Sequence, residues 1–532
     1  MNDNLCLRRK IPGNPKLHFF NKQIEGNYRC ERTAECHLQR EFLEKKLKRW
    51  GISGFKIIQS AASTIKIEFQ KEDDVTKFMR EFIIIARNFV PGIEYSQTFI
   101  QKEESGNDEN WNEALEEKLN EKKNRPSTLY YPNLMIVKRD NRTALPIRAE
   151  EDRFMVKDYN EKDELVQVYM DEANCRKFKK ARPAHEKLEG ELLADSDDDD
   201  SNNLTAKIDS SRELPVKIEE ISKNFIAVVH ADGNGLGQLL QNQKNNPDFD
   251  IKNFSQSLDA CTVNSARNAF GYIKEVYDKD SKDKYPFRPI VLGGDDFTFV
   301  CKADDAVEFT KRFMLEFEKN SANSSELNKN GGKLTVCAGI AFVKKNYPMY
   351  YAYELAESLC SLAKKKAKEL KGRKKNLDVI PSCLAFRKEL GSFAEDFENI
   401  KDKNAEFIFG PYAVSDSGDE LPQTDSLLKV VKVLKDNNAF KSFLRNWMSE
   451  KLVNPHSAQL LKERFIQVAG EKHPEEYKDF CAALKELVPQ ENGDLTLEKD
   501  GASPVLDILT LISIAEKPET DSKKEGGENG GN

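Results

Sequence analysis

The sequence has little histidine and no paired-cysteine motif. Only 6 histidines and 10 cysteines occur in 532 residues, and no two cysteines have the Cys-x-x-Cys spacing typical of zinc elements. The closest pair outside the central region, Cys30 and Cys36, has no matching second pair. We therefore expect the scattered cysteines to be ordinary buried thiols of a reducing compartment.

Long apolar runs are also absent. No apolar segment approaches the roughly 18 residues that a membrane helix requires, and the amino terminus is polar. We therefore expect a cytoplasmic protein with neither a cleaved signal nor a membrane span. The formal net charge of −7 argues against a protein that coats nucleic acid over its whole surface, although it is compatible with a local basic groove.

A Gly-Gly-Asp-Asp segment at 293–296 is the most informative feature that is present. It lies between two apolar runs, which predicts a β-hairpin with Asp295 and Asp296 at its tip. Upstream, the apolar run 225–229 predicts a strand buried on both faces, and it leads into a glycine-rich turn at Asp232. If these strands are neighbours, Asp232 meets the two hairpin carboxylates.

Three carboxylates at one sheet edge suit phosphoryl chemistry. Two Mg²⁺ ions about 3.5 to 4 Å apart can activate an attacking hydroxyl and stabilise a leaving phosphate oxygen. Mg²⁺ uses few protein oxygens and keeps its other positions for water and phosphate. Glycines let the backbone approach a triphosphate and donate N–H groups to it. The candidate nucleotide-binding glycines are Gly233, Gly235, Gly237, Gly293 and Gly294.

Other interpretations of these turns are open to test against the sequence. Taken alone, Gly-Gly-Asp-Asp is also a good hairpin turn with solvated acids. A calcium loop beginning at Asp232 is excluded because its fifth position is Leu236 and its twelfth is Gln243. A dinucleotide fingerprint is excluded because its third glycine position is Gln238.

The order of elements around the acids predicts the fold class. Apolar residues recur at helical spacing in 254–277, 305–320 and 352–362, and 334–342 has the pattern of a buried strand. The resulting order is β-α-β-β-α-β-α. We therefore predict an α/β (α+β) fold with a ferredoxin-like sheet, as in the palm of polymerases and nucleotidyl cyclases.

Three motifs together carry a resemblance to a known family. Residues 231–237, the hairpin, and the strand 337–342 followed by Tyr347-Pro348 and a Leu/Ala-rich helix resemble the palm of the large, polymerase-like subunit of type III CRISPR effector complexes. Those palms make cyclic oligoadenylates from ATP. The similarity extends over 221–390 and is closer to standalone bacterial proteins that carry only the second such palm. The GGDEF diguanylate cyclases are a more distant resemblance.

The resemblance implies a site. It assigns catalysis and metal coordination by Mg²⁺ or Mn²⁺ to Asp232, Asp295 and Asp296, with the carbonyl of Gly233 as a further ligand. The usual Asp-Gly-Asp turn has Asn234 as its last residue here, which removes one charge, and we expect this amide beside the phosphates. No His-Asp dipeptide occurs in the chain, which argues against the HD nuclease domain that these subunits often carry.

Basic residues are concentrated between 364 and 375. Cations near the end of a helix also complement its dipole and improve solubility, so the run has a purely structural interpretation. Lys364 and Lys368 are four residues apart and share a helix face, and they are the candidate phosphate contacts.

The rest of the chain is predicted to flank this palm. We expect a scaffolding ferredoxin-like domain, an irregular region with an acidic loop at 195–200, the palm, a linker, a helical domain and a disordered tail. Their predicted ranges are 1–105, 106–220, 221–390, 391–424, 425–515 and 516–532.

The function predicted from these features is a Mg²⁺-dependent nucleotidyltransferase that makes a cyclic or linear oligonucleotide from ATP or another purine triphosphate in antiviral defence. Two alternatives stay open: a nucleotide-binding scaffold or sensor within an RNA-guided defence ribonucleoprotein, and a homodimeric cyclic dinucleotide synthase of the GGDEF kind. Nucleic-acid cleavage is least favoured, because no general base or HD pair accompanies the acids.

Overall fold

The computed structural model divides into two compact units, residues 1–186 and 187–532. Each unit is described by itself. The predicted acidic loop at 195–200 and the predicted tail at 516–532 lie outside the described residues. The described ranges are 2–9, 40–61, 64–89, 95–102, 110–124, 137–140, 145–147, 154–157, 165–168, 170–179, 181–194, 214–243, 251–277, 284–328, 332–373, 379–389, 409–415, 421–489, 495–499 and 501–515.

The first unit contains an antiparallel four-stranded sheet of order β2-β3-β1-β4. This strand order and the β-α-β-β-α-β sequence of elements are the ferredoxin-like arrangement. The sequence pattern indicated the helices and strands between 40 and 102, but neither the first strand, which is polar at most positions, nor the helix at 110–123. The elements are β1 (Asn2–Arg9), α2 (Arg40–Arg49), β2 (Phe55–Ala61), β3 (Thr64–Phe69), α3 (Glu72–Phe89), β4 (Tyr95–Lys102) and the following α4 (Asn110–Lys123).

Residues 106–220, which were predicted to be irregular, contain several short helices and strands. Short elements form where the pattern alternates polar and apolar pieces, and a two-stranded antiparallel hairpin pairs Phe154 with Val168. These elements are β5 (Phe154–Lys157), β6 (Leu165–Val168), α5 (Glu172–Lys179), α6 (Ala181–Leu193) and η1 (Ile218–Glu220).

The second unit is built on a mixed six-stranded sheet of order β12-β11-β10-β7-β9-β8. Its central strand β7 pairs antiparallel with β9 and β10, and β11 adds parallel to β10. The predicted α/β class is confirmed, and the predicted succession of strands and helices is present. The elements are β7 (Phe225–Gly233), α7 (Leu236–Gln243), α8 (Ile251–Tyr277), β8 (Phe287–Gly293), β9 (Asp296–Lys302), η2 (Ala303–Asp305), α9 (Ala306–Asn323), β10 (Val336–Lys344), α10 (Met349–Arg373), β11 (Cys383–Lys388) and β12 (Tyr412–Ala413).

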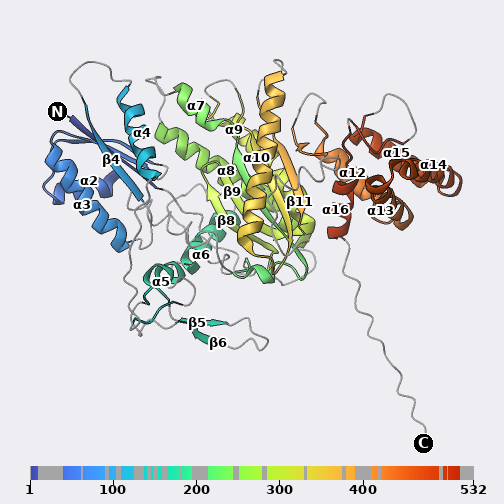
Figure 1. The fold of residues 1–532 in the computed structure, drawn as a ribbon, viewed down its shortest axis with the longest axis horizontal. Helices are drawn as coiled ribbons and strands as arrows, with labels where there is room; N and C mark the ends of the chain where they lie inside the picture. The colour runs from blue at the N-terminus through green and yellow to red at the C-terminus, as the bar shows by residue number, and fades with distance from the viewer. Residues whose placement is uncertain are drawn as a thin grey trace, which may run out of the picture. The chain divides into compact units, whose positions relative to one another are not determined.

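Helices cover both faces of this sheet. On one face, Phe297 of β9 packs against Phe309 and Phe313 of α9, with ring centroids 6.2 and 4.8 Å apart. On the other face, α10 lies against β10 and β11 (Figure 1). Gly339 permits this close approach, because a Cβ there would lie 2.0 Å from the carbonyl oxygen of Ala356.

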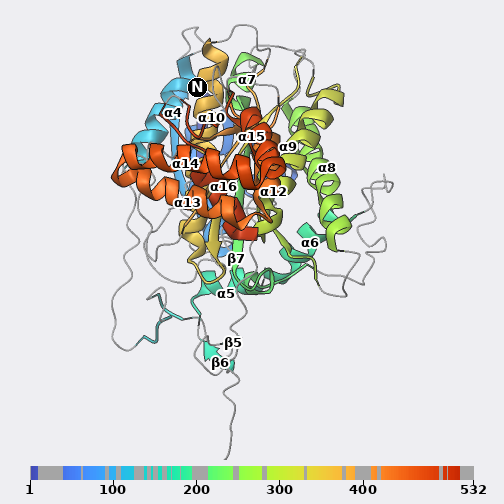
Figure 2. The same ribbon diagram turned by 90° about the vertical axis from the view of Figure 1, so that its right-hand side faces the viewer.

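After the sheet, the described residues between 424 and 515 form five helices, whereas the amphipathic stripes predicted four and missed the helix Asn438–Val453. Figure 2 shows them grouped together, with α16 among α12, α13 and α15. The apolar α16 also anchors the group to the sheet, since Ser513 accepts a hydrogen bond from Lys388 (2.7 Å). Among the described helices, none is both long and apolar enough to cross a membrane. The five are α12 (Thr424–Leu434), α13 (Asn438–Val453), α14 (Pro455–Lys472), α15 (Pro474–Leu487) and α16 (Val505–Ala515).

Candidate functional site

Strand register brings the predicted carboxylates together at one end of the sheet. Asp232, near the end of β7, is paired directly with Asp296, the first residue of β9. Directly opposed residues of an antiparallel pair project from the same face, and these two side chains are 38% and 37% exposed. Asp295 forms the hairpin tip, where its carbonyl accepts a hydrogen bond from the Gly233 N–H (3.2 Å).

The pKa of Asp295 shows that the three carboxyl groups influence one another. Burial, the negative charge of Asp232, a hydrogen bond with Asp232 and the negative charge of Asp296 together raise the pKa of Asp295 to about 6. A carboxyl group held near other carboxylates resists ionisation because like charges repel. The hairpin therefore presents excess negative charge that a cation would neutralise.

Helix α8 holds the hairpin turn in place through two hydrogen bonds to Gly294. Its Asp259 accepts a hydrogen bond from the Gly294 N–H (2.9 Å), and its Thr262 hydroxyl donates to the Gly294 carbonyl (2.5 Å). Gly293 and Gly294 have φ angles of 152° and 63°, which L side chains rarely adopt. A Cβ on Gly293 would also lie 2.6 Å from Asp259 Oδ1. The glycines are thus required by the turn and by its contact with α8.

Sequence reasoning missed Asp259 and Thr262. Asp259 lies on the exposed side of the amphipathic helix, where a solvated side chain is the usual expectation. The sequence signal was Thr262, because this polar residue lies four positions from both Leu258 and Ala266 and so falls on the buried stripe.

Lys364 of α10 reaches the acids directly. Its ammonium lies 2.5 Å from Asp232 Oδ2 and donates a hydrogen bond to the Gly233 carbonyl (2.8 Å). The second predicted lysine, Lys368, is exposed one turn further along the helix. The structure therefore joins Lys364, but not Lys368, to the carboxylates.

The remaining predicted glycines have separate places. Gly235 has a φ of 71°, which lets the chain turn sharply between β7 and α7. Gly237 lies in the first turn of α7, and a Cβ there would meet nothing within 4 Å. Gly237 is thus not required for close packing.

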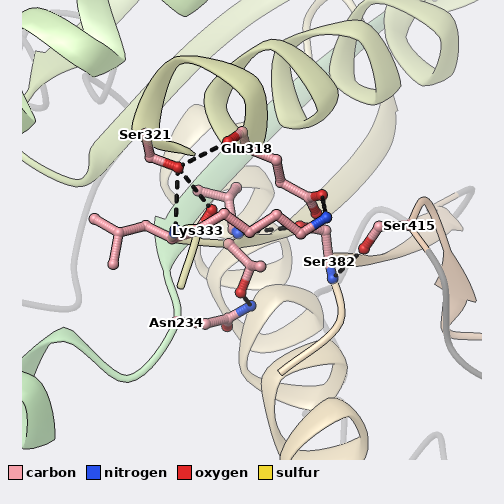
Figure 3. A network of polar contacts seen from close by, with 9 residues as sticks. Asn234, Glu318, Ser321, Lys333, Ser382 and Ser415 are labelled. Atoms are coloured by element: carbon pink, nitrogen blue, oxygen red, sulfur yellow. Dashed lines mark hydrogen bonds and ion pairs between the residues drawn. The ribbon is translucent and has the colours of Figure 1, made fainter. Parts of the chain in front are cut away.

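Asn234 does not face the acids. The residue is only 7% exposed, its Nδ2 donates to the Thr335 hydroxyl (3.0 Å), and its backbone N–H donates to the Thr335 carbonyl (2.8 Å). The side chain belongs to a polar network that also contains Ser321 and Ser382 (Figure 3). The sequence placed Asn234 beside the phosphates, whereas the structure turns its amide toward Thr335, the residue before β10.

His230 and Thr298 support Asp296 and were not predicted. The Thr298 hydroxyl donates to Asp296 Oδ1 (3.2 Å), and His230 Nδ1 lies 3.0 Å from Thr298 Oγ1 and 3.4 Å from Asp296 Oδ1. Burial disfavours the charged imidazole, but the hydrogen bond and charge of Asp296 and the charge of Asp232 raise the pKa of His230 above its usual value. Alternation along β7 gives the signal, because residues 230 and 232 share a face.

The donor set suits an ion that completes its coordination from outside the protein. Among the described residues, no three His, Cys, Asp or Glu side chains gather closely enough to form a metal site by themselves. Two neighbouring carboxylates and the Gly233 carbonyl are hard oxygen donors, and Mg²⁺ combines a few of these with water and substrate phosphate. The residues fit Mg²⁺ or Mn²⁺ on that basis.

With this geometry established, comparison with known proteins identifies the sheet. Residues 225–376 match the family model of the Cas10/Cmr2 second palm domain. The matched range includes β7, the acid hairpin and the whole of α10. The resemblance deduced from the motifs is therefore confirmed for the palm.

Solved structures give further similarities to the chain. No protein of curated function matches it. It is similar to a Csm1-Csm4 cassette in complex with cA4 (12% identity, 82% of this chain and 63% of that chain, TM-score 0.36). It is also similar to such a cassette in complex with one ATP (13%, 97% and 70%, 0.44) and to Csm1 in T.onnurineus (13%, 96% and 69%, 0.39). The chain thus spans 63% to 70% of the length of these proteins.

Proposed function

We propose that the palm is a divalent-metal-dependent nucleotidyltransferase that joins ATP, or another purine triphosphate, into a linear or cyclic oligonucleotide. The observation that carries this proposal is the direct pairing of Asp232 with Asp296 beside the hairpin tip at Asp295. This arrangement lies within a range that matches a Cas10/Cmr2 palm. Crowded carboxylates that resist ionisation are the electrostatic condition for binding a divalent cation.

Each part of the site has a role in this proposal. Bound Mg²⁺ or Mn²⁺ would supply activation of the attacking ribose hydroxyl and stabilisation of charge on the α-phosphate. Asp232, Asp295 and Asp296 would hold the ion, with the Gly233 carbonyl as a further ligand. Because the Gly233 and Gly294 N–H groups already donate to Asp295 and Asp259, the backbone N–H groups at the start of α7, after Gly235, would bind phosphate oxygens. Lys368 would add an exposed positive charge.

A second candidate function is nucleotide binding without turnover, as a sensor or scaffold. Two observations favour it: the ammonium of Lys364 already occupies oxygens of Asp232 and Gly233, and position 234 carries a buried amide. Both features reduce the negative charge available to a metal ion.

The setting proposed for either function is antiviral defence. The similar cassettes contain Csm1 together with Csm4 and were solved with ATP or cyclic oligoadenylates. We infer that this chain also works with effector subunits, through surfaces outside the acid hairpin.

Incubation of the full chain with each labelled nucleoside triphosphate and Mg²⁺ or Mn²⁺, followed by mass analysis, tests the proposal. Oligonucleotide and pyrophosphate are expected from ATP or another purine triphosphate. Binding of ATP with metal but no pyrophosphate, even with candidate partner RNA and protein added, would replace the enzyme by the sensor. Neither binding nor turnover would contradict both functions.

A further inference from the structure

Lys364 is held at the sheet edge by the packing of its own helix. Ala363 and Ala367, on either side of it along α10, are fully buried against the β10–β11 face of the sheet. Their small side chains let the helix lie close to the strands. Lys364 is 18% exposed, whereas the adjacent Lys365 is exposed to solvent. The position of Lys364 is therefore built into the fold and is not a chance feature of a basic surface.

The ammonium bridges two oxygens from consecutive residues. It contacts Asp232 Oδ2 at 2.5 Å and the Gly233 carbonyl at 2.8 Å. An ammonium has three N–H donors, and these contacts use two of them. The same two oxygens are the ones assigned above to the divalent ion. Lys364 thus occupies part of the ligand set of the proposed metal.

Both cations cannot use these oxygens at once. Mg²⁺ binds oxygen at about 2.1 Å, so an ion on Asp232 and Gly233 would lie within a few ångströms of the ammonium and repel it strongly. Lysine has a flexible four-carbon stem, so the ammonium can move away while the helix stays in place. The space next to the acids, where the triphosphate would bind, offers it new anionic partners.

We propose, resting on the proposed function, that Lys364 is a resident cation which holds the metal-free site together and which a divalent ion must displace. The displaced ammonium then binds the triphosphate. Metal and nucleotide consequently bind with positive cooperativity, because the nucleotide provides a partner for the ammonium that the metal releases. Lys364 is a positioning residue for the empty site and a phosphate contact in the loaded one.

Mn²⁺ binding to the full chain tests this, with titration calorimetry and no nucleotide. Lys364→Met removes the competing charge, and we expect it to bind Mn²⁺ about tenfold more tightly than the wild type. Lys365→Met is the matched control, since it removes the same charge one residue away, and its affinity should stay within about twofold of the wild type. α,β-Methylene-ATP should increase the Mn²⁺ affinity of the wild type by a larger factor than that of Lys364→Met.

The outcomes separate this inference from the function on which it rests. If Lys364→Met binds Mn²⁺ no more tightly than the wild type, the role of Lys364 is overturned. If Asp232→Asn also weakens Mn²⁺ binding, the metal site itself stands. Mn²⁺ binding that is unchanged in Asp232→Asn, or absent from the wild type, would overturn both. If circular dichroism shows that Lys364→Met is unfolded, Lys364→Gln is measured with the same expectation. Lys364→Arg keeps the charge, so a tenfold tightening in that variant would also overturn the inference.

Discussion

The two ferredoxin-like sheets of this chain share an element order but differ at one edge. The orders β2-β3-β1-β4 and β8-β9-β7-β10 place each unit's first strand at the same internal position. In the palm that strand ends in Asp232-Gly233, next to the hairpin tip Gly294-Asp295. In the first unit β1 ends in Arg8-Arg9, and the connection between β2 and β3 at 62–63 lies outside the described residues.

The helix that follows the last strand differs as well. In the first unit α4 has 14 residues and buries Leu115 and Leu119 beside Ile100. In the palm α10 has 25 residues and carries Lys364 to the acids. One topology thus provides an equivalent edge twice, and the palm edge is the one that carries Asp232, Asp295 and Asp296.

The largest expected effect on stability comes from disrupting the packing of α10 on the palm sheet. In Gly339→Ala the new Cβ would meet the Ala356 carbonyl and the Cys360 N–H, at 2.0 and 2.4 Å. Both are backbone atoms that cannot turn aside, so we expect a loss of unfolding free energy of about 3 kcal/mol or more. Urea denaturation measures it. Strand β4, which corresponds to β10, contains no glycine, so the packing of α4 on β4 does not depend on such a contact.

A matched glycine substitution provides the control. Gly271 lies within α8, and a Cβ there would meet nothing within 4 Å. Gly271→Ala should therefore raise the unfolding free energy, by up to about 1 kcal/mol. Equal stability of the two variants would contradict the close packing of α10.

The second effect concerns the hairpin of the palm, whose turn accepts a hydrogen bond from α8. Thr262→Val keeps the side-chain shape but removes the hydroxyl that donates to the Gly294 carbonyl. We expect a stability loss of about 1 kcal/mol and a fall in triphosphate turnover of about 10- to 100-fold, because Asp295 would no longer be held in place. Steady-state kinetics with thermal melts measure both. Full turnover in the folded variant would show that α8 does not position the hairpin.

The smallest effect concerns the attachment of α16, which carries Asp507, to β12, which carries Tyr412; the described residues of the first unit contain no counterpart of this helical group. Burial raises the pKa of Asp507 to about 7, although the hydrogen bond from Tyr412 (2.5 Å) opposes this. The folded state therefore binds the Asp507 proton more tightly than the unfolded chain does. The stability from that proton is complete below about pH 4 and is lost as the pH rises through about 7.

Asp507→Asn should remove this dependence, because its amide stays neutral. We expect the wild type to lose roughly 1 to 2 kcal/mol of unfolding free energy between pH 5 and 8 through this group, and the variant to lose correspondingly less. Thermal unfolding across that range measures the difference. Parallel pH profiles for the two proteins would mean that Asp507 ionises normally.

Much of this architecture could be predicted, because local patterns carry it. The apolar run 225–229 and the glycines at 293 and 294 identify a buried strand and a tight hairpin from residue types alone. Strand β1 was missed because its alternation is weak and its sheet position depends on pairing with β3 and β4. Pairing of this kind is tertiary, and propensity does not contain it.

The candidate site shows the same division. Asp232, Asp295 and Asp296 follow from the motif, and their meeting follows from the predicted neighbouring strands. The direction of Asn234 could not be predicted, since it depends on a hydrogen bond to Thr335, 101 positions further along the chain. The contact of Lys364 with Asp232 spans 132 positions and depends on how deeply α10 packs.

The central claim is that the palm edge, and not its equivalent in the first unit, carries the chemistry. Pyrophosphate release from ATP with Mg²⁺ tests it in Asp295→Asn with Asp296→Asn and in Arg8→Ala with Arg9→Ala. We predict a loss of turnover of about 1,000-fold or more in the first double variant, with a nearly unchanged melting temperature, and turnover within about twofold of the wild type in the second. Undiminished turnover by the folded Asp295→Asn, Asp296→Asn protein would contradict the account.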